Sequence, residues 1–280
     1  MIDSNFIPLH ITAKHNDFIG NHNAGRYVFV PGSDSRAKTI ANYFDNKAEI
    51  RPSSRGHNLY LGTITKNNIT IDVASISTGM GTSSADIIIN ELLKLGAKKF
   101  LRVGTCGLLQ PKFMQGGDLA VATSAIKDEH TTSCYVPKEY PAIASIEMIN
   151  AISAAAKKIN KRKIHYGVFH TKSSLYAREF KQGAMKQQNT DYMDIIKNAG
   201  AIASEMEAAM LFTLCNLADA QQMGNTNYQF KDQVLSGAIC SVLGEEEDFG
   251  TPEMIKALTE DMIELGIDTF FELNKLNINQ

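Results

Sequence analysis

Three short segments carry residue types that together could bind an anion and a sugar. Arg102-Val103-Gly104-Thr105 places a cation and a hydroxyl beside glycine, and Pro31-Gly32-Ser33-Asp34-Ser35-Arg36 repeats the combination near the N-terminus. Arginine, hydroxyl and free backbone N–H groups are the usual partners of a phosphate anion. Far downstream, Glu205-Met206-Glu207 offers carboxylates, which can accept hydrogen bonds from two adjacent hydroxyls such as those of ribose.

Each segment also has a purely structural interpretation. Arg36 would then be a solvated surface arginine, and Arg102 the partner of a nearby carboxylate. The two glutamates would only favour the start of a helix through its macrodipole. From the residues alone, the structural interpretation is preferred for Arg36 and for the two glutamates, whereas the neighbours of Arg102 favour an anion-binding role.

Strands and helices are predicted to alternate around these segments. The pattern predicts strands over 27–31, 59–65, 69–76, 99–103, 119–124, 166–170 and 234–242, and helices over 34–44, 84–95, 146–159, 207–217 and 252–273. Asn67-Asn68 fits the tight turn of a hairpin, and Gly96 fits the end of a helix. The alternation indicates one α/β domain over residues 1–280, with a mixed central sheet flanked by helices. Arg102 would then lie just before a glycine-bounded turn, at the edge of the sheet where ligands bind.

Composition limits the classes of partner. The net charge of the 280 residues is −2, so we expect neither nucleic acid nor a membrane surface as a partner. The four cysteines form no C-x-x-C pair, so we expect no metal site. No basic and apolar leader begins the chain, and no apolar run reaches the roughly 20 residues that span a bilayer. We therefore expect a cytoplasmic protein.

Together the motifs resemble the nucleoside phosphorylase-I family, most closely its uridine phosphorylases. The resemblance also rests on Leu9-His10-Ile11-Thr12, Ser77-Thr78-Gly79-Met80-Gly81, Glu91-Leu92 and Gly117-Asp118. It implies a nucleoside phosphorylase-like fold and an enzyme that needs no cofactor. Inorganic phosphate, the co-substrate, would attack C1′ of a nucleoside through an oxocarbenium-like transition state and release the base.

The resemblance also implies a role for individual residues. The implied phosphate ligands are Gly32, Arg36, Arg55, Arg102 and Thr105. The implied ribose ligands are His10, Thr105, Glu205, Met206 and Glu207, and the implied base contacts are Cys106, Gly107, Lys172, Arg178 and Gln182. Arg102 and Glu207 would be the catalytic residues. Residues like His10 and Arg55 come from a neighbouring subunit in this family, which implies a homo-oligomer built from dimers, as in the hexamers of the family.

The base is the part of the substrate that the sequence defines least. Uridine phosphorylases usually read uracil with a Gln-x-Arg pair, and residues 171–183 contain none. Lys172, Arg178 and Gln182 are candidate replacements, or else part of an exposed basic loop. Purine phosphorylases of the family usually carry a late aspartate, and here only Asp248 is near, in an acidic run. We expect uridine as the substrate; a purine nucleoside phosphorylase, a nucleosidase and a silent nucleoside-binding relative stay open.

Overall fold

The computed structural model describes residues 3, 5–159, 161–244 and 251–278. Within them, ten strands form one mixed sheet, in the order β10-β6-β8-β9-β5-β1-β4-β3-β2, with β7 paired to β6. The strands are Tyr27–Phe29 (β1), Glu49–Arg51 (β2), Leu59–Lys66 (β3), Ile69–Ile76 (β4), Lys99–Leu108 (β5), Leu119–Asp128 (β6), Ala142–Ile143 (β7), Ile164–Lys172 (β8), Ala203–Glu205 (β9) and Leu235–Val242 (β10).

Five of these strands close into a small barrel. The long strand β5 pairs with β10 along its length in parallel and with β9 antiparallel at its far end. Strands β6 and β8 connect β10 to β9 and complete the ring. The remaining strands β1, β4, β3 and β2 extend from β5 as an open wing. The sheet is therefore mixed, as the sequence predicted.

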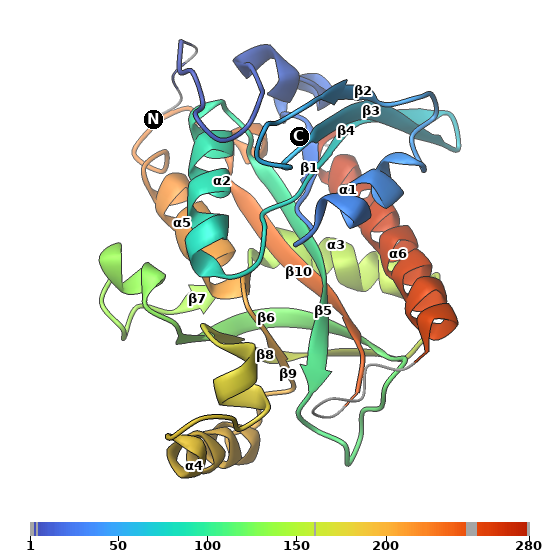
Figure 1. The fold of residues 1–280 in the computed structure, drawn as a ribbon. Helices are drawn as coiled ribbons and strands as arrows, with labels where there is room; N and C mark the ends of the chain where they lie inside the picture. The colour runs from blue at the N-terminus through green and yellow to red at the C-terminus, as the bar shows by residue number, and fades with distance from the viewer. Residues whose placement is uncertain (1–2, 4, 160, 245–250, 279–280) are drawn as a thin grey trace.

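Helices cover both faces of the sheet. They are Asp34–Ala41 (α1), Thr82–Lys94 (α2), Ile146–Ala156 (α3), Lys186–Asn198 (α4), Ala208–Ala220 (α5) and Pro252–Ile278 (α6). Helices α2 and α5 pack together on one side, and α3 packs with α6 on the other (Figure 1). Each pair buries its own apolar cluster against the sheet. This arrangement confirms the predicted α/β architecture with flanking helices.

Strand β5 differs from the prediction in a way that matters for the site. The strand does not end at Val103 before a turn; it continues through Gly104 and Thr105 to Leu108. It continues because Gly104, Thr105 and Cys106 pair with β10 in parallel. Alternate side chains of a strand point to opposite faces, so Arg102 shares a face with buried Phe100 and Cys106.

The local signals at turns are confirmed, whereas several short elements were not predicted. Asn67 and Asn68 have positive φ angles of 53° and 61° in the β3–β4 hairpin, and Gly96 has φ of 96° after α2. The unpredicted elements are α4 and the strands β2, β7 and β9. The strands have two or three residues each, too few to show an alternating pattern, and α4 buries only three residues of a mostly polar sequence.

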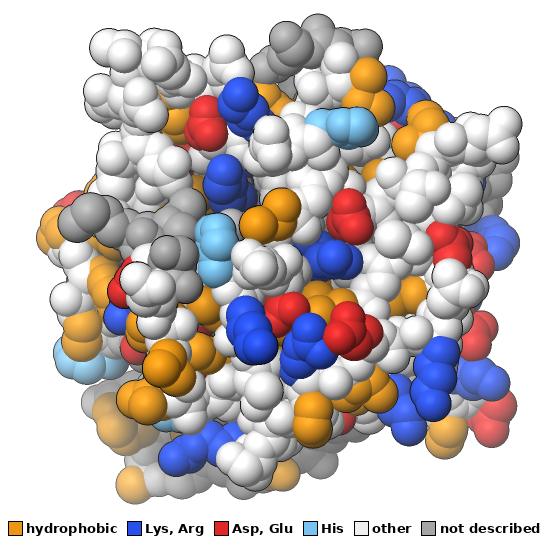
Figure 2. Space-filling model, turned by 90° about the horizontal axis from the view of Figure 1, so that it is seen from above, with side chains coloured by type: hydrophobic (Ala, Val, Ile, Leu, Met, Phe, Trp, Pro, Cys, Tyr) orange, Lys and Arg blue, Asp and Glu red, His pale blue; other side chains and the backbone are white. Residues whose placement is uncertain are grey.

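The surface carries charges of both signs. Figure 2 shows Lys and Arg side chains intermingled with Asp and Glu on one face, with single hydrophobic side chains between them. Among the described residues, no helix has the length and apolar character needed to cross a bilayer.

Candidate functional site

A cavity of about 270 Å³ lies beside β5, near the carboxyl ends of β1, β8, β9 and β10. Ten of the residues implied by the family resemblance line it: Gly32, Arg36, Arg102, Thr105, Cys106, Gly107, Lys172, Glu205, Met206 and Glu207. The other lining residues are Ser33, Met80, Leu175, Glu179, Ser204, Leu243 and Gly244. The carboxyl ends of strands are where ligands bind in α/β folds, so the topology brings distant segments to one site.

Arg102 is held in this cavity by two carboxylates. Its Nε donates to Glu205 Oε2 at 2.9 Å, and its Nη2 forms an ion pair with Glu207. Its third nitrogen, Nη1, is buried and has no hydrogen-bond partner within the described residues. An orphaned buried donor is costly in a protein unless a ligand supplies the acceptor.

Glu205 is committed to structure. Its Oε2 accepts the backbone N–H groups of Glu207 and Ala208 at 2.8 and 2.9 Å, at the start of α5, and its Oε1 accepts from the Thr171 hydroxyl. With Arg102 also bound, both carboxylate oxygens are used. The sequence interpretation gave Glu205 to ribose; this geometry instead makes it a positioning residue that fixes Arg102 and the first turn of α5.

Glu207 has one oxygen on Arg102 and the other on the backbone N–H of Gly81. The side chain is buried, which raises the pKa of its carboxyl; Arg102 opposes this shift and the nearby Glu205 carboxylate adds to it. Two carboxylates thus share a single guanidinium. An anion bound to Arg102 would compete for that ion pair and release Glu207 for hydroxyl groups of a ligand.

Arg36 lies at the same end of the cavity. Helix α1 begins after Ser33, whose hydroxyl accepts the Arg36 backbone N–H at 3.4 Å, as the sequence predicted. Burial lowers the pKa of the Arg36 guanidinium, and the positive charge of Arg102 lowers it further. No carboxylate among the described residues forms an ion pair with Arg36. Two neighbouring cations therefore concentrate positive charge locally in a chain whose net charge is −2.

The other end of the cavity contains a buried ion pair. Lys172, at the end of β8, pairs with Glu179 and also donates to the Ser204 hydroxyl at 3.0 Å. Glu179 closes a π-helical turn, Leu175–Glu179 (η4), and its carboxylate lies over Gly107. A Cβ at position 107 would lie 1.9 Å from Glu179 Oε1, so only glycine leaves room for the carboxylate.

Two of the predicted base contacts lie outside the cavity lining. Arg178 points away from it and binds Asp128 through Nε and Nη2 at 2.7 and 2.8 Å, and Asn189 through Nη1 at 2.7 Å. Gln182 is exposed. The guanidinium of Arg178 is therefore used to fix the η4 turn, and sequence alone could not separate this use from base binding.

The two residues expected to serve a neighbouring subunit lie on the outside of this chain. The Glu91 carboxylate holds the His10 ring at 2.8 Å and accepts the backbone N–H groups of Leu9, His10 and Ile11. Arg55 is exposed in the loop between β2 and β3. The loop meets the N-terminal segment where the Ser53 hydroxyl donates to the His10 carbonyl at 2.9 Å.

The sequence interpretation missed seven lining residues, chiefly Glu179 and Ser204. Ser204 directly precedes the motif residue Glu205 in the sequence, and this position is the signal that could have placed it. Glu179 lies in the same loop as the basic residues predicted for the base, and no pattern in the sequence marks an acidic residue there as a lining residue. Asp248, the aspartate considered for purine chemistry, lies outside the described residues.

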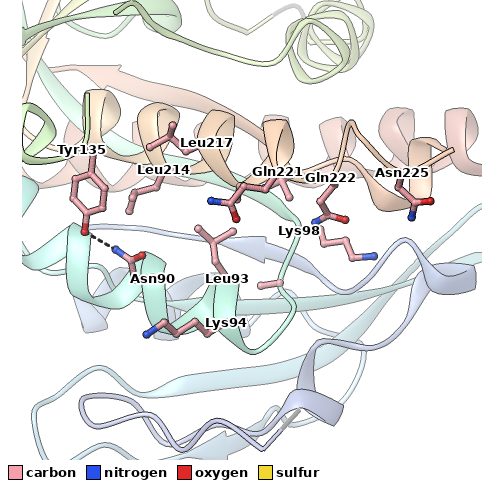
Figure 3. A pocket seen from close by; sticks show the side chains of 13 residues that line it. Asn90, Leu93, Lys94, Lys98, Tyr135, Leu214, Leu217, Gln221, Gln222 and Asn225 are labelled. Carbon is pink, nitrogen blue, oxygen red and sulfur yellow. Dashed lines mark hydrogen bonds between the residues drawn. The ribbon is translucent and has the colours of Figure 1, made fainter. Parts of the chain in front are cut away.

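A larger cavity of about 460 Å³ lies elsewhere, between α2 and α5 (Figure 3). Leu93, Leu214 and Leu217 line it, with Lys94, Lys98 and amide side chains beside them. It has no carboxylate among its lining residues, and its Lys98 already donates to the Lys231 carbonyl at 3.2 Å. Across the part of the chain that is described, no group of three or more His, Cys, Asp or Glu side chains is arranged to hold a metal ion.

The model of the phosphorylase superfamily matches residues 26–267. The chain belongs to this superfamily. It is 34% identical over 211 residues to a uridine phosphorylase from Thermococcus kodakarensis, which is 74% of this chain and 72% of the relative. It is 31% identical over 250 residues to a guanosine phosphorylase from Halorubrum lacusprofundi, 86% of this chain and 91% of the relative.

A third relative is the DeoD-type purine nucleoside phosphorylase of Buchnera aphidicola, 32% identical over 218 residues, 77% of this chain and 83% of the relative. These phosphorylase superfamily members act on different nucleosides according to their names. The family therefore fixes the class of chemistry, whereas the base has to be argued from the cavity.

Proposed function

We propose that this protein is a nucleoside phosphorylase whose substrate is a pyrimidine nucleoside. Among these nucleosides we propose uridine. The observation that carries the proposal is the buried, unpaired Nη1 of Arg102 beside Arg36, in a cavity that also holds Glu207. A cation pair of this kind suits phosphate, and a buried carboxylate suits a ribose diol.

The reaction needs positioning and electrostatic stabilisation. Arg36 and Arg102 would hold phosphate, with the Thr105 hydroxyl beside it. A phosphate oxygen forms a bond to C1′ while the C1′–N bond breaks, and the electron pair of that bond leaves with the base. Glu207 would accept hydrogen bonds from the 2′- and 3′-hydroxyls, and its negative charge favours the cation-like sugar. Met206 would lie against the sugar as an apolar surface.

We also propose that the active unit is a dimer, in which His10 and Arg55 complete the partner's site. Both lie on the outer surface of this chain rather than in its own cavity. Leu9, next to His10, is 83% exposed, and Met80 at the cavity is exposed to the same extent. Exposed apolar side chains around a site are typical of a surface that another chain covers.

Product analysis of a nucleoside panel tests the proposal. Uridine, thymidine, deoxyuridine, cytidine, inosine and adenosine are each incubated with and without phosphate. Phosphate-dependent release of uracil with formation of ribose 1-phosphate is the expected result. Cleavage that is independent of phosphate would indicate a nucleosidase. Phosphate-dependent release of a purine base would show that the substrate is a purine nucleoside and not uridine. No cleavage of any nucleoside would contradict an enzymatic function.

Arg36 gives the test of the phosphate site that disturbs the fold least, because no carboxylate is left unpaired when it is removed. We expect Arg36→Met to raise the KM for phosphate on the order of 10- to 100-fold, with a smaller effect on the KM for the nucleoside. Lys38→Met removes a cation from the exposed face of the same helix and serves as the control. An unchanged phosphate KM in Arg36→Met would exclude this cavity end as the phosphate site.

A further inference from the structure

One end of the cavity holds charges that neither phosphate nor sugar accounts for. Lys172 and Glu179 are both buried, at 2% and 8% exposure, and form an ion pair there. Glu179 Oε2 is paired with the Lys172 ammonium and enclosed by protein, whereas Oε1, the oxygen over Gly107, accepts no hydrogen bond from the described residues. A buried carboxylate with unused acceptor capacity is expensive unless a ligand supplies the donor.

The surroundings fix this pair in place. Asn189 accepts from Arg178 and donates to the Ala177 carbonyl at 2.9 Å, while Ser174 caps the first turn of η4. These hydrogen bonds fix the part of the η4 turn that leads up to Glu179. Gly107 leaves the space into which the Glu179 carboxylate projects.

Lys172 is oriented by a second chain of hydrogen bonds. The buried His170 ring binds Asp128 Oδ2 at 2.8 Å and the Ser204 hydroxyl at 3.0 Å. When the Nε2–H of His170 donates to Asp128, the Nδ1 of His170 is free to accept a hydrogen bond. The Ser204 hydroxyl can then donate to this Nδ1 and accept from Lys172. The ammonium of Lys172 therefore keeps two donors for Glu179 and for a ligand.

We propose that Lys172 and Glu179 together read the lactam edge of the base, an N–H next to a C=O, with Glu179 accepting from the N–H and Lys172 donating to the oxygen. The inference rests on the proposed nucleoside phosphorolysis and names the groups that select the base. A carboxylate can only accept and an ammonium can only donate, so the pair requires a donor and an acceptor side by side. Uracil and the 6-oxopurines present this edge.

Cytosine and adenine also present a donor beside an acceptor, but their acceptor is a ring nitrogen. When the C1′–N bond breaks, the base leaves with the bonding electrons, and in a lactam base the negative charge spreads onto the carbonyl oxygen. An ammonium fixed at that oxygen stabilises the departing base, in a site that excludes water. Oxygen carries this charge better than a ring nitrogen, so the pair favours the lactam bases.

N-methylation of the base tests the inference without any substitution in the protein. Calorimetry measures binding of uracil against 3-methyluracil and of hypoxanthine against 1-methylhypoxanthine, with cytosine and adenine alongside, to the wild-type protein with phosphate present. We expect the preferred unmethylated lactam base to bind on the order of 100-fold more tightly than its methylated form and than the aminated bases. In Glu179→Leu, which leaves no acceptor at this position, the ratio should fall to within a few-fold of one.

Three further variants complete the test, the first as a control and the other two at the proposed pair. Asp194→Asn removes an exposed carboxylate from α4 and should keep the wild-type ratio. Glu179→Asp shortens the side chain and should lower the ratio only in part, and this variant also serves if Glu179→Leu folds poorly. Lys172→Met should reduce kcat for the nucleoside more than it weakens base binding, because its charge acts on the departing base.

Equal binding of methylated and unmethylated lactam bases, or a preference for cytosine or adenine, would overturn the inference even if phosphorolysis occurs. A ratio that is unchanged in Glu179→Leu would overturn it as well. Conversely, base selectivity that depends on Glu179 in a protein that cleaves no nucleoside would support the inference while the proposed function fails. The two failures are therefore distinguishable.

Discussion

At the scale of single residues, the site depends on one guanidinium shared by two carboxylates. Glu205 uses both oxygens to fix Arg102 and the start of α5, whereas Glu207 has Arg102 and one backbone N–H. The two glutamates are separated only by Met206 and look equivalent in the sequence. Only the geometry separates the one that positions from the one that remains exchangeable, because the difference lies in which backbone N–H groups each carboxylate meets.

The raised pKa of Glu207 predicts an acid limb in the pH profile. Burial is the main cause, and the ordinary carboxyl value is 4.5. Glu207 must be ionised to accept both hydroxyls, so kcat/KM for the nucleoside should rise with pH through an apparent pKa above 4.5. Glu207→Gln should lack this limb and lose on the order of 100-fold in kcat, measured at saturating phosphate so that phosphate titration contributes little.

Glu139→Gln is the matched control, since Glu139 is exposed and outside the cavity lining. Its profile should match that of the wild type. If Glu207→Gln keeps the acid limb, a different group is responsible for it and the role of Glu207 has to be reassigned.

At the scale of elements, the sequence predicted the long strands and helices and misplaced what depends on pairing. Val103 ended the predicted strand because Gly104 is a poor strand former, yet β10 pairs with residues 99–106 and keeps β5 extended. Likewise β9 exists because Ala203–Glu205 fits between β8 and β5. Tertiary pairing of this kind cannot be seen in a local pattern, and it sets the position of Thr105 and Ser204.

The start of β5 offers a stability prediction. Lys99 is fully buried and donates to the carbonyls of Phe230 and Gln233, which ties the turn Phe230–Asp232 (η5) to the sheet. Burial lowers the pKa of Lys99 from 10.5 to about 7. Between these values the unfolded chain binds more protons than the folded one, so stability rises with pH. This group should add roughly 1–2 kcal/mol between about pH 7 and pH 8.5.

Urea unfolding at several pH values measures this slope. The range ends near pH 8.5 because buried tyrosine and cysteine side chains with raised pKa, such as Tyr27 and Cys215, contribute with the opposite sign at higher pH. Lys99→Met should flatten the slope, and Lys112→Met, at an exposed lysine, should leave it intact. Parallel curves for Lys99→Met and wild type would show that Lys99 keeps its proton throughout.

At the scale of the whole molecule, motifs in the sequence predicted the candidates for phosphate and sugar, whereas of the pair that we propose for the base the sequence predicted Lys172 and missed Glu179. The residues of the first group lie in motifs of consecutive residues, such as Arg102–Thr105 and Glu205–Glu207. The second group, Lys172 and Glu179, is brought together by η4, whose form depends on α4 and on Asp128. His10 and Arg55 are a third case, because a single chain cannot show whose cavity they serve.

Co-expression of two inactive variants settles that last point. In a dimer with shared sites, a Glu207→Gln subunit can lend an intact Arg55 to an Arg55→Ala subunit that has an intact Glu207. Half of the randomly formed dimers are mixed and each contains one complete site, so roughly a quarter of the wild-type kcat should return. Co-expression of Glu207→Gln with Arg36→Met, assayed like the first mixture at a phosphate concentration near the wild-type KM, is the control, because both residues belong to the same chain's cavity and no complete site can form. Recovery in both mixtures, or in neither, would mean that Arg55 does not act across a subunit boundary.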